Sequence, residues 1–429
     1  NIHKDMDFTI LVWVDMDTQI KRIKGRDKLN MDEVMNRINS QMSLDEKKEI
    51  ADFLSLGVDN IYVFSSFYKP HLGGVEKYVE NFYKRLPNHN STIVTSKYEK
   101  LLQYEDKDEN LKIIRIDSYQ ILKDKYYIPT IQGLKEINKL LKINPTIETE
   151  IHTHTRFYLT NFVATILARK YKIKHYHFEH GSSFVQDGSV LVRFFAYLFD
   201  HTLGKYILNK SDLVFPISEG VRKFLEKNYK NAKLGPTIYN SYDIKNKNFK
   251  QSVKPDKPKL LFVGRLVKSK GIYELIEAAK ILKEENFTFT LTLIGDGSEK
   301  SNLEKYLLDS KLSNQVTIKG RLPYEKTQLE FPKYDIFINP SYTEGLPTTV
   351  LEALFNNLLI VATNVGGTNE ILPEGMLIKI KDLSPKIISE NLKNIFNNWE
   401  KLQTEYESIY KDRKEKFSWD ENIKKYLEY

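Results

Sequence analysis

Two successive runs of alternating strand and helix patterns most constrain the fold of this chain. The first run begins with an apolar strand at residues 61–64 and continues with a helical pattern at 75–86. A polar, lysine-rich linker follows at 243–259, and the alternation restarts with the apolar stretch 259–263. This pattern predicts an α/β fold with two doubly wound, Rossmann-like domains on parallel sheets. Ligands of such sheets bind beyond the carboxyl ends of the strands, so we expect a cleft between the domains.

Length and composition narrow the class of protein. The 429 residues suffice for two or three domains, and the absence of cysteine excludes disulfide bonds and thiolate metal sites. The sequence has no apolar run of about 18 residues and no secretory signal pattern, so we expect a cytoplasmic protein. The net charge of +8 is compatible with nucleic acid, an anionic membrane surface or phosphorylated substrates as partners.

Two glutamates eight residues apart, Glu344 and Glu352, bracket a Gly-Leu-Pro sequence between an apolar strand and a helical pattern. We expect Glu344 in the loop and Glu352 about two turns along the helix. The unpaired N–H groups of a helix start suit an anion, and carboxylates accept hydrogen bonds from sugar hydroxyls. The pattern therefore favours a phosphorylated sugar with a ribose nearby. The alternative is a turn acid at Glu344 and a solvated helix residue at Glu352.

Two cations follow the first strand of the second domain. Gly264 ends that strand and lets backbone approach a ligand, while Arg265 and Lys270 flank the start of the next helix. A guanidinium and an ammonium group placed here are suited to a diphosphate. The alternative is a strand-to-helix turn with exposed cations. Gly366-Gly367 followed by Glu370 is a weaker example of the same strand–glycine pattern.

The first domain carries a glycine pair and a set of histidines. Gly73 and Gly74 precede the helix at 75–86, where they either present backbone N–H groups to a ligand or form a simple turn. His180 ends a strand and is expected to point into the cleft. Four histidines could suggest a metal site, but it is disfavoured because no carboxylate or cysteine set accompanies them. The histidines for which a structural role is favoured are His152 and His177, with His154 on the same strand face as His152.

Read in order, these motifs resemble glycosyltransferase family 4, whose members are retaining enzymes of GT-B fold. The resemblance covers about residues 60–429 and rests on Gly-Gly, His-Gly, Gly-Arg-Leu…Lys-Gly, Gly-Asp-Gly and Glu…Glu, each at a strand end. It implies that Arg265 and Lys270, beside Gly264, bind the diphosphate of the donor. It also implies that Glu352 binds the ribose hydroxyls, and that His180 faces the transferred sugar.

The resemblance assigns the remaining donor-side positions as well. The Gly73-Gly74 loop would line the phosphate and acceptor side. Glu344 and the amides of the stretch from Gly345 to Pro347, followed by Thr348, would hold the donor sugar. The implied catalytic residues are His180, Glu344, Arg265 and Lys270. The implied donor-binding residues are Gly73, Gly74, Gly264, Arg265, Lys270, Glu344, Gly345, Leu346, Pro347, Thr348 and Glu352.

The implied activity is retaining transfer of a hexosyl or N-acetylhexosaminyl group from a nucleotide diphosphate sugar, with a UDP-sugar favoured. The acceptor would be a glycan, a lipid-linked glycan or a protein in surface polysaccharide or glycoconjugate synthesis. No tightly bound cofactor, no metal and no nucleic acid are expected. Two alternatives stay open: a sugar-nucleotide 2-epimerase of the same fold, and a basic, non-enzymatic protein that binds membranes or nucleic acid.

The first 57 residues have a separate resemblance. An apolar strand at 8–14 leads into a charged helical pattern from 18 to about 56, and this segment resembles the C-terminal part of dephospho-CoA kinase. That family's phosphate-binding loop is absent from this sequence, and without it phosphoryl transfer should fail. We interpret the segment as an inactive remnant, an engineered fusion or an accessory unit. Asp15 and Asp17 imitate a metal motif, but a structural strand end is favoured.

The expected domains are therefore residues 1–57, 58–245 on the acceptor side, 246–400 on the donor side, and C-terminal helices at 401–429 that pack back across the cleft. The aromatic residues of the tail that should dock it are Trp399, Phe417, Trp419 and Tyr426. A basic helix at 135–142 and an aromatic cluster at 194–199 would suit the inner face of a membrane. For these two the favoured interpretations are a solvated face and buried core.

Overall fold

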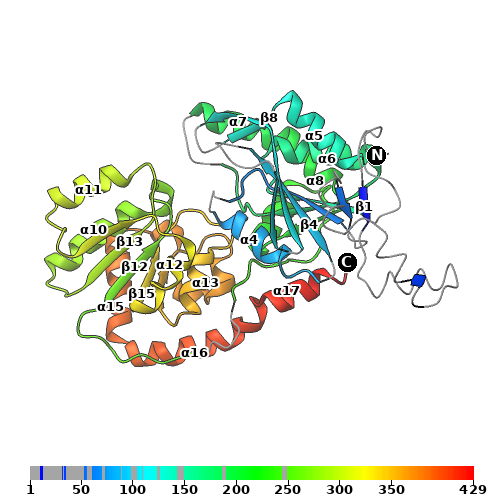
Figure 1. Cartoon of the computed structure of the whole chain (residues 1–429). Coiled ribbons are helices and arrows are strands. Elements are labelled where there is room, and N and C mark those ends of the chain that lie inside the picture. The colour runs from blue at the N-terminus through cyan, green and yellow to red at the C-terminus, as the bar shows by residue number, and fades with distance from the viewer. Residues whose placement is uncertain are drawn as a thin grey trace.

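The computed structural model describes residues 10–12, 31, 33–34, 53–55, 60–69, 73–87, 89–97, 104–108, 110–122, 126–142, 149–185, 190–243 and 249–429. Within these ranges two parallel sheets stand side by side, each flanked by helices (Figure 1). This arrangement confirms the expected pair of doubly wound, Rossmann-like domains. The proposed boundaries at 57, 245 and 400 stay predictions.

The first sheet has the order β11-β10-β9-β3-β4-β6-β5 and is parallel except at β5. Its strands are β3 (Asn60–Phe64), β4 (Asn90–Ser96), β5 (Tyr104–Asp108), β6 (Leu111–Ile116), β9 (Thr149–His154), β10 (Lys174–Glu179) and β11 (Leu213–Pro216). The accompanying helices are α4 (Gly74–Tyr83), α5 (Ile131–Leu141), α6 (Leu159–Tyr171), α7 (Val190–Phe199), α8 (Lys205–Lys210) and α9 (Glu219–Asn228). A hairpin of β7 (Ser118–Leu122) and β8 (Tyr126–Pro129) lies beside α5 and α6.

The second sheet has the order β14-β13-β12-β15-β16 and is parallel throughout. Its strands are β12 (Lys259–Val263), β13 (Thr290–Ile294), β14 (Val316–Gly320), β15 (Ile336–Asn339) and β16 (Leu359–Ala362). Its helices are α10 (Ile272–Glu284), α11 (Lys300–Asp309), α12 (Tyr324–Gln328), α13 (Thr348–Leu354), α14 (Thr368–Ile371) and α15 (Pro385–Asn397).

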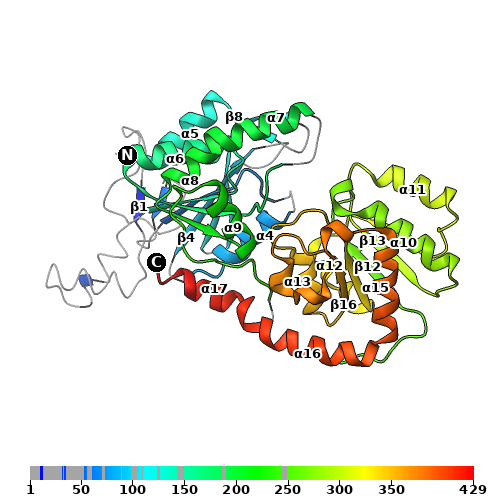
Figure 2. The ribbon, with the colours of Figure 1, turned by 180° about the vertical axis from the view of Figure 1, so that it is seen from behind.

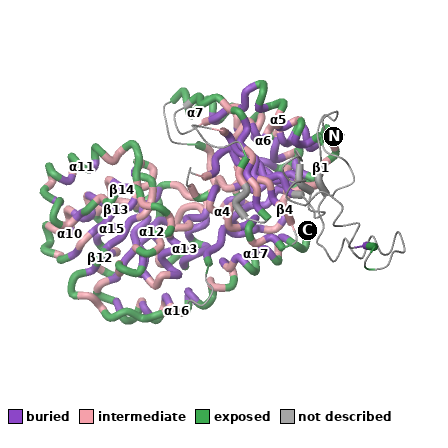
Figure 3. Tube along the Cα trace, viewed as in Figure 1, coloured by how far each residue is buried: buried purple, intermediate pink, exposed green. Residues whose placement is uncertain are grey.

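Continuous apolar stretches form the central strands because parallel sheets are covered on both faces. Leu260, Leu261 and Phe262 are all buried, as is the whole of β15. Figure 3 shows the buried residues gathered along the strands and the exposed ones on the outer helices. Local signals fix the helix starts: the Ser218 hydroxyl accepts from the Val221 N–H at α9, and the Ser384 hydroxyl accepts from the Ile387 N–H at α15.

The C-terminal helices join the two domains. Helix α16 (Trp399–Lys416) runs along the second domain and α17 (Trp419–Tyr426) packs on the first (Figures 1 and 2). The chain just before the linker contacts this crossing, because the Tyr242 N–H donates to the Phe417 carbonyl at 3.0 Å. The docking of the tail is confirmed by its four buried aromatic residues, Trp399, Phe417, Trp419 and Tyr426.

The N-terminal segment is described in part only. Strand β1 (Ile10–Val12) pairs in parallel with β2 (Phe53–Ser55). The expected helix therefore does not reach residue 56, because its C-terminal end pairs as a strand. Asp15, Asp17 and most of the helical stretch lie outside the described residues.

Candidate functional site

The carboxyl ends of strands from both sheets face the junction between the domains, where four loops meet. The Ser182 hydroxyl donates to the Glu344 carbonyl, and the hydroxyls of Ser183 and Thr343 lie 3.2 Å apart. The loop after β10 thus contacts the loop after β15. Parallel α/β sheets bind ligands at this end of the strands, so the junction is the candidate site.

Lys270 and Glu344 come together at the junction, as the sequence predicted. The Lys270 ammonium donates to Glu344 Oε1 at 2.6 Å, and the Asn339 amide lies 3.5 Å from the same oxygen. Gly271 follows with φ +65°, and an added Cβ would overlap the Pro340 carbonyl. Only glycine therefore lets the two loops approach closely enough for this ion pair.

Arg265 lies beside the same junction but does not join the ion pair. It is exposed at the end of β12, directly after Gly264, whose N–H donates to the Ile294 carbonyl at 3.0 Å. Burial raises the pKa of Tyr158, and the positive charge of Arg265 opposes that rise. The guanidinium therefore lies near a tyrosine of the first domain.

The backbone after Glu344 is held on both sides. The Gly367 N–H donates to the Gly345 carbonyl at 2.7 Å, and a Cβ on Gly345 would overlap the His180 carbonyl. Leu346 is buried below this turn. One predicted hydrogen-bond donor is wrong. Pro347 has no N–H group, so the backbone N–H donors of this stretch belong to Gly345 and Leu346.

Glu352 lies just over one turn into α13, because that helix begins at Thr348 and not farther upstream. Its side chain is buried, and its Oε1 lies 3.6 Å from the ammonium of Lys77 on α4. The same ammonium lies 3.8 Å from the centre of the Tyr324 ring. The interpretation of Glu352 as a solvated helix residue is therefore wrong.

The structure gives a steric reason for one of the two glycines at the start of α4. Gly73 is the N-cap, and a Cβ there would overlap the carboxylate of Glu76, which folds back over the helix start. A Cβ on Gly74 would meet nothing within 4 Å. Glu76 brings a negative charge to the place where the sequence suggested a phosphate, and that assignment stays a prediction.

His180 packs among aromatic rings at the end of β10. One of its ring nitrogens lies 3.1 Å from His154 Nδ1, and its ring centre lies 5.0 Å from that of Tyr78. Burial lowers the pKa of His180 to about 4, while the charge of Glu179 opposes the shift. The imidazole is therefore neutral at pH 7.

His152, His154 and His177 make contacts within the first domain. His152 and His154 both contact the Tyr83 hydroxyl at 2.8 Å, which confirms that they share one strand face. His177 is fully buried against Thr153, as the structural interpretation requires. Among the residues that the structure describes, no group of three or more His, Cys, Asp or Glu could hold a metal ion.

A buried ion-pair network holds the loop that carries His180. Glu179 accepts from the Arg156 guanidinium at 2.8 Å and from the Gly181 N–H at 2.7 Å. Arg156 also donates to Asp200 at 2.7 Å and to the Ser183 carbonyl at 3.0 Å. Burial disfavours the charged form of Glu179, but Arg156 and His177 outweigh it and lower its pKa to about 2.

Sequence reasoning missed Arg156, Lys77 and the position of Glu370. The Glu370 carboxylate accepts from the N–H groups of Glu219 and Gly220 at 3.0 Å, so it caps α9 of the other domain. The acidic residue after Gly366-Gly367 was the one available signal for Glu370. Nothing in the sequence marks Lys77 or Arg156, because their partners are distant along the chain.

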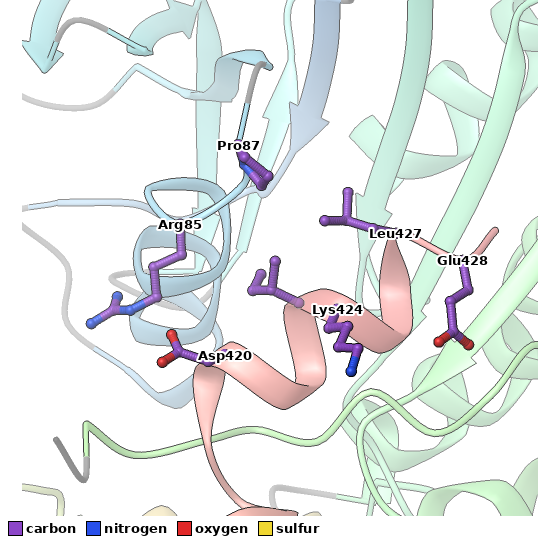
Figure 4. Close-up of a pocket in the computed structure, with 7 residues that line it drawn as sticks. Arg85, Pro87, Asp420, Lys424, Leu427 and Glu428 are labelled. Carbon is purple, nitrogen blue, oxygen red and sulfur yellow. The ribbon is translucent and has the colours of Figure 1, made fainter.

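Two pockets of the described residues lie away from the junction. A pocket of about 440 Å³ lies between the end of α4 and α17, where Arg85, Pro87 and Lys424 line it (Figure 4). A second, of about 390 Å³, lies next to it around Trp419. Neither is lined by a predicted donor-binding residue. Within the described residues, no helix is both long and apolar enough to cross a membrane.

Comparisons with known proteins agree with the fold and identify the family. The family model "Glycosyltransferase Family 4" matches residues 72–246, and "Glycosyl transferases group 1" matches residues 243–425. An uncharacterized glycosyltransferase of Methanocaldococcus jannaschii is 31% identical over 384 residues, which cover 85% of this chain and 96% of the relative. The GPI3 subunit of phosphatidylinositol N-acetylglucosaminyltransferase from Saccharomyces cerevisiae is 24% identical over 76% of this chain and 72% of its own.

A solved structure shares the fold. The Anabaena protein HepE, in complex with UDP and glucose, superposes with a TM-score of 0.65 at 15% identity, covering 86% of this chain and 98% of its own.

The N-terminal segment matches a different protein. The dephospho-CoA kinase model matches residues 1–60. The kinase of Clostridium tetani is 52% identical over these 60 residues, which span 25% of its length. The resemblance of this segment is thereby confirmed, while its role stays open. Over residues 72–425, the chain belongs to the family 4 glycosyltransferases and is a glycosyltransferase of GT-B fold.

Proposed function

We propose that this chain transfers a sugar from a nucleotide diphosphate sugar to an acceptor with retention of anomeric configuration. The observation that carries the proposal is the ion pair between Lys270 and Glu344 at the domain junction. Each partner satisfies the other in this structure. A donor would exchange that pair for two contacts, with its diphosphate on the ammonium and its sugar hydroxyls on the carboxylate.

The reaction chiefly requires stabilisation of the negative charge that develops on the leaving diphosphate. Lys270 and the exposed guanidinium of Arg265 would supply two positive charges without a metal ion. The neutral imidazole of His180 would face the transferred sugar as a hydrogen-bonding group and not as a cation. Attack from the face of the departing phosphate, with that phosphate accepting the acceptor's proton, would retain configuration.

A UDP-sugar is the donor that we propose. The structural neighbour HepE binds UDP and glucose, and the buried carboxylate of Glu352 suits ribose hydroxyls. The hexosyl or N-acetylhexosaminyl type follows from relatives such as the N-acetylglucosaminyltransferase subunit. The phosphatidylinositol acceptor in that relative's name supports a lipid-linked acceptor here, in a pathway of surface glycoconjugate synthesis.

The test compares Lys270→Ala and Glu344→Ala with two controls. Lys268→Ala removes an exposed lysine of the short 3-10 helix Lys268–Lys270, which also carries Lys270. Glu330→Ala removes a 2.7 Å ion pair with Lys319 away from the junction. We expect Lys270→Ala and Glu344→Ala to lose at least about 100-fold in kcat/KM without a change in melting temperature. The two control variants should retain the wild-type kcat/KM.

The readout is release of UDP together with mass spectrometry of the products. Near wild-type turnover in both junction variants would overturn the proposal. Epimerised donor formed without any acceptor would replace it with the 2-epimerase activity. A thermal-shift screen against UDP, GDP and ADP, each with its sugars, identifies the nucleotide independently of the acceptor.

A further inference from the structure

Helix α7 is apolar and yet lies on the surface. Its ten residues contain a single charge, Arg193, and only Ala196 is buried. Phe194 and Phe195 are each 58% exposed, and Tyr197 is 56% exposed. The interpretation of the aromatic cluster as buried core is therefore wrong. Figure 3 shows α7 as an exposed helix at the edge of the first domain.

The surroundings of α7 are strongly basic. Helices α5, α6 and α8 lie on the same side of the first domain as α7 (Figures 1 and 2). These four helices carry seven exposed cations and a single acidic residue, Glu136. We call them the basic face: Lys135, Lys139, Arg169, Lys170, Arg193, Lys205 and Lys210. The basic patch at 135–142 therefore lies on the same side of the first domain as five further exposed cations.

Neighbouring elements add further exposed apolar side chains. On α5, Ile131 is 76% exposed, and on β7, Tyr119 and Ile121 are 69% and 57% exposed. Aromatic and aliphatic groups surrounded by lysine and arginine suit a surface that is apolar below and negatively charged above. The interface of a bilayer containing anionic lipid has these two properties.

Helix α7 is also connected to the candidate site. The loop that contacts Glu344 and Thr343 through Ser182 and Ser183 continues to Phe184. The Phe184 ring lies 5.2 Å from that of His201 and 6.5 Å from that of Tyr197. An element that rests on α7 therefore reaches the predicted sugar-binding loop directly.

We infer that α7 and the basic face dock on an anionic lipid bilayer, which presents a lipid-linked acceptor to the domain junction. The inference that α7 docks on a bilayer is argued only from the exposure of its side chains and the charge of the basic face. The identity of the acceptor rests on the proposed function. Docking at α7 would hold the junction at the level of the lipid head groups and place an acceptor head group beside the loop at 181–185.

The test is flotation of the full chain with vesicles of phosphatidylcholine alone or mixed with phosphatidylglycerol. Phe194→Glu with Phe195→Glu removes the aromatic contact, and Lys135→Glu with Lys139→Glu reverses part of the basic face. Leu308→Glu with Leu329→Glu is the matched control, because both leucines are 69% exposed but lie on the second domain. Circular dichroism and the UDP thermal shift check that each variant folds.

We expect wild type and control to float with anionic vesicles, and both test variants to bind about tenfold or more weakly. Binding should also weaken as salt is raised. Three outcomes would overturn the inference. The wild-type protein would not float, the control variant would lose as much vesicle binding as the test variants, or the wild type would bind neutral and anionic vesicles equally. A dimer in sedimentation that the phenylalanine variant dissociates, without vesicle binding, would assign the surface to a second copy. Flotation involves no sugar transfer, so its outcome is separate from that of the proposed function.

Discussion

The ammonium group of Lys77, on α4 of the first domain, lies 3.6 Å from the carboxylate of Glu352, on α13 of the second. This pair crosses the domain junction and fixes the carboxylate to which the sequence assigned the ribose. The Lys77 ammonium also lies over Tyr324, so it connects the first domain to two elements of the second. We therefore predict that Lys77 is a positioning residue for Glu352.

Lys77→Met is expected to raise the KM for the donor about five- to tenfold with little change in kcat, because a partly buried ion pair contributes about 1 kcal/mol. Steady-state kinetics with a varied donor separate the two parameters. Lys84→Met is the control, since it removes a more exposed pair with Glu80 beside the same helix. An unchanged KM in Lys77→Met would show that Glu352 needs no such support.

Gly345→Ala should impair closure of the junction. The added methyl group would overlap the His180 carbonyl, so the two loops would have to separate. Overpacking of this kind costs about 1–3 kcal/mol, which corresponds to a loss of roughly tenfold or more in kcat/KM. Gly375→Ala, where a Cβ meets nothing within 4 Å, should retain full activity. Equal activity of the two variants would contradict the close packing of this loop.

Arg156→Ala should destabilise the first domain severely. It leaves Glu179 and Asp200 without their shared cation in a buried environment, which costs about 3–5 kcal/mol. Arg156→Lys should not rescue stability, because one ammonium cannot replace the three hydrogen bonds that the guanidinium donates to Glu179, Asp200 and the Ser183 carbonyl. Urea unfolding measures the free energy, and the exposed Arg169→Ala should change it by less than about 0.5 kcal/mol. A similar small loss at Arg156 would mean that the network is not needed for folding.

Acid should weaken the fold below about pH 6.5. Burial lowers the pKa of His180 to about 4, and it also lowers the pKa of His152, His154 and His175. Between pH 6.5 and 4 the unfolded chain then binds more protons than the folded one, so stability falls as pH falls. Below about pH 4.5 protonation of Glu179, whose folded pKa is about 2, adds to the loss.

Urea unfolding at pH 7.5, 6.0 and 5.0 checks this dependence. Each buried histidine contributes up to about 1.4 kcal/mol per pH unit within its window. His154→Gln should reduce the slope, because it removes one imidazole whose pKa burial lowers. A stability that is flat between pH 7.5 and 5 would refute the assignment of neutral, buried imidazoles.

Sequence patterns predicted the two sheets because strands covered on both faces are continuous apolar stretches. The stretch at 260–262 and the whole of β15 show this most clearly. The approach of Lys270 to Glu344 was also predictable, because each follows a neighbouring strand of one parallel sheet. The position of Glu344 and Lys270 in one site thus follows from topology alone.

Contacts between the domains were not predictable in the same way. The partners of Lys77 and of Glu370 are set by how two separate sheets meet, and no local pattern records that. The exposure of α7 was missed because an apolar segment in a globular protein is usually core. Helix α13 begins at Thr348, too late to place Glu352 two turns along it, and helix ends are the least certain part of a pattern.

The crossing at Tyr242 and Phe417 has a mechanical consequence. The polypeptide passes from one domain to the other twice, and a backbone hydrogen bond of 3.0 Å ties the two passages together. Two tethers at one point would act as a pivot, about which we expect the halves to swing during opening. The travel of any group during opening then grows with its distance from this pivot, and a substitution there would change the rate of opening without touching a substrate.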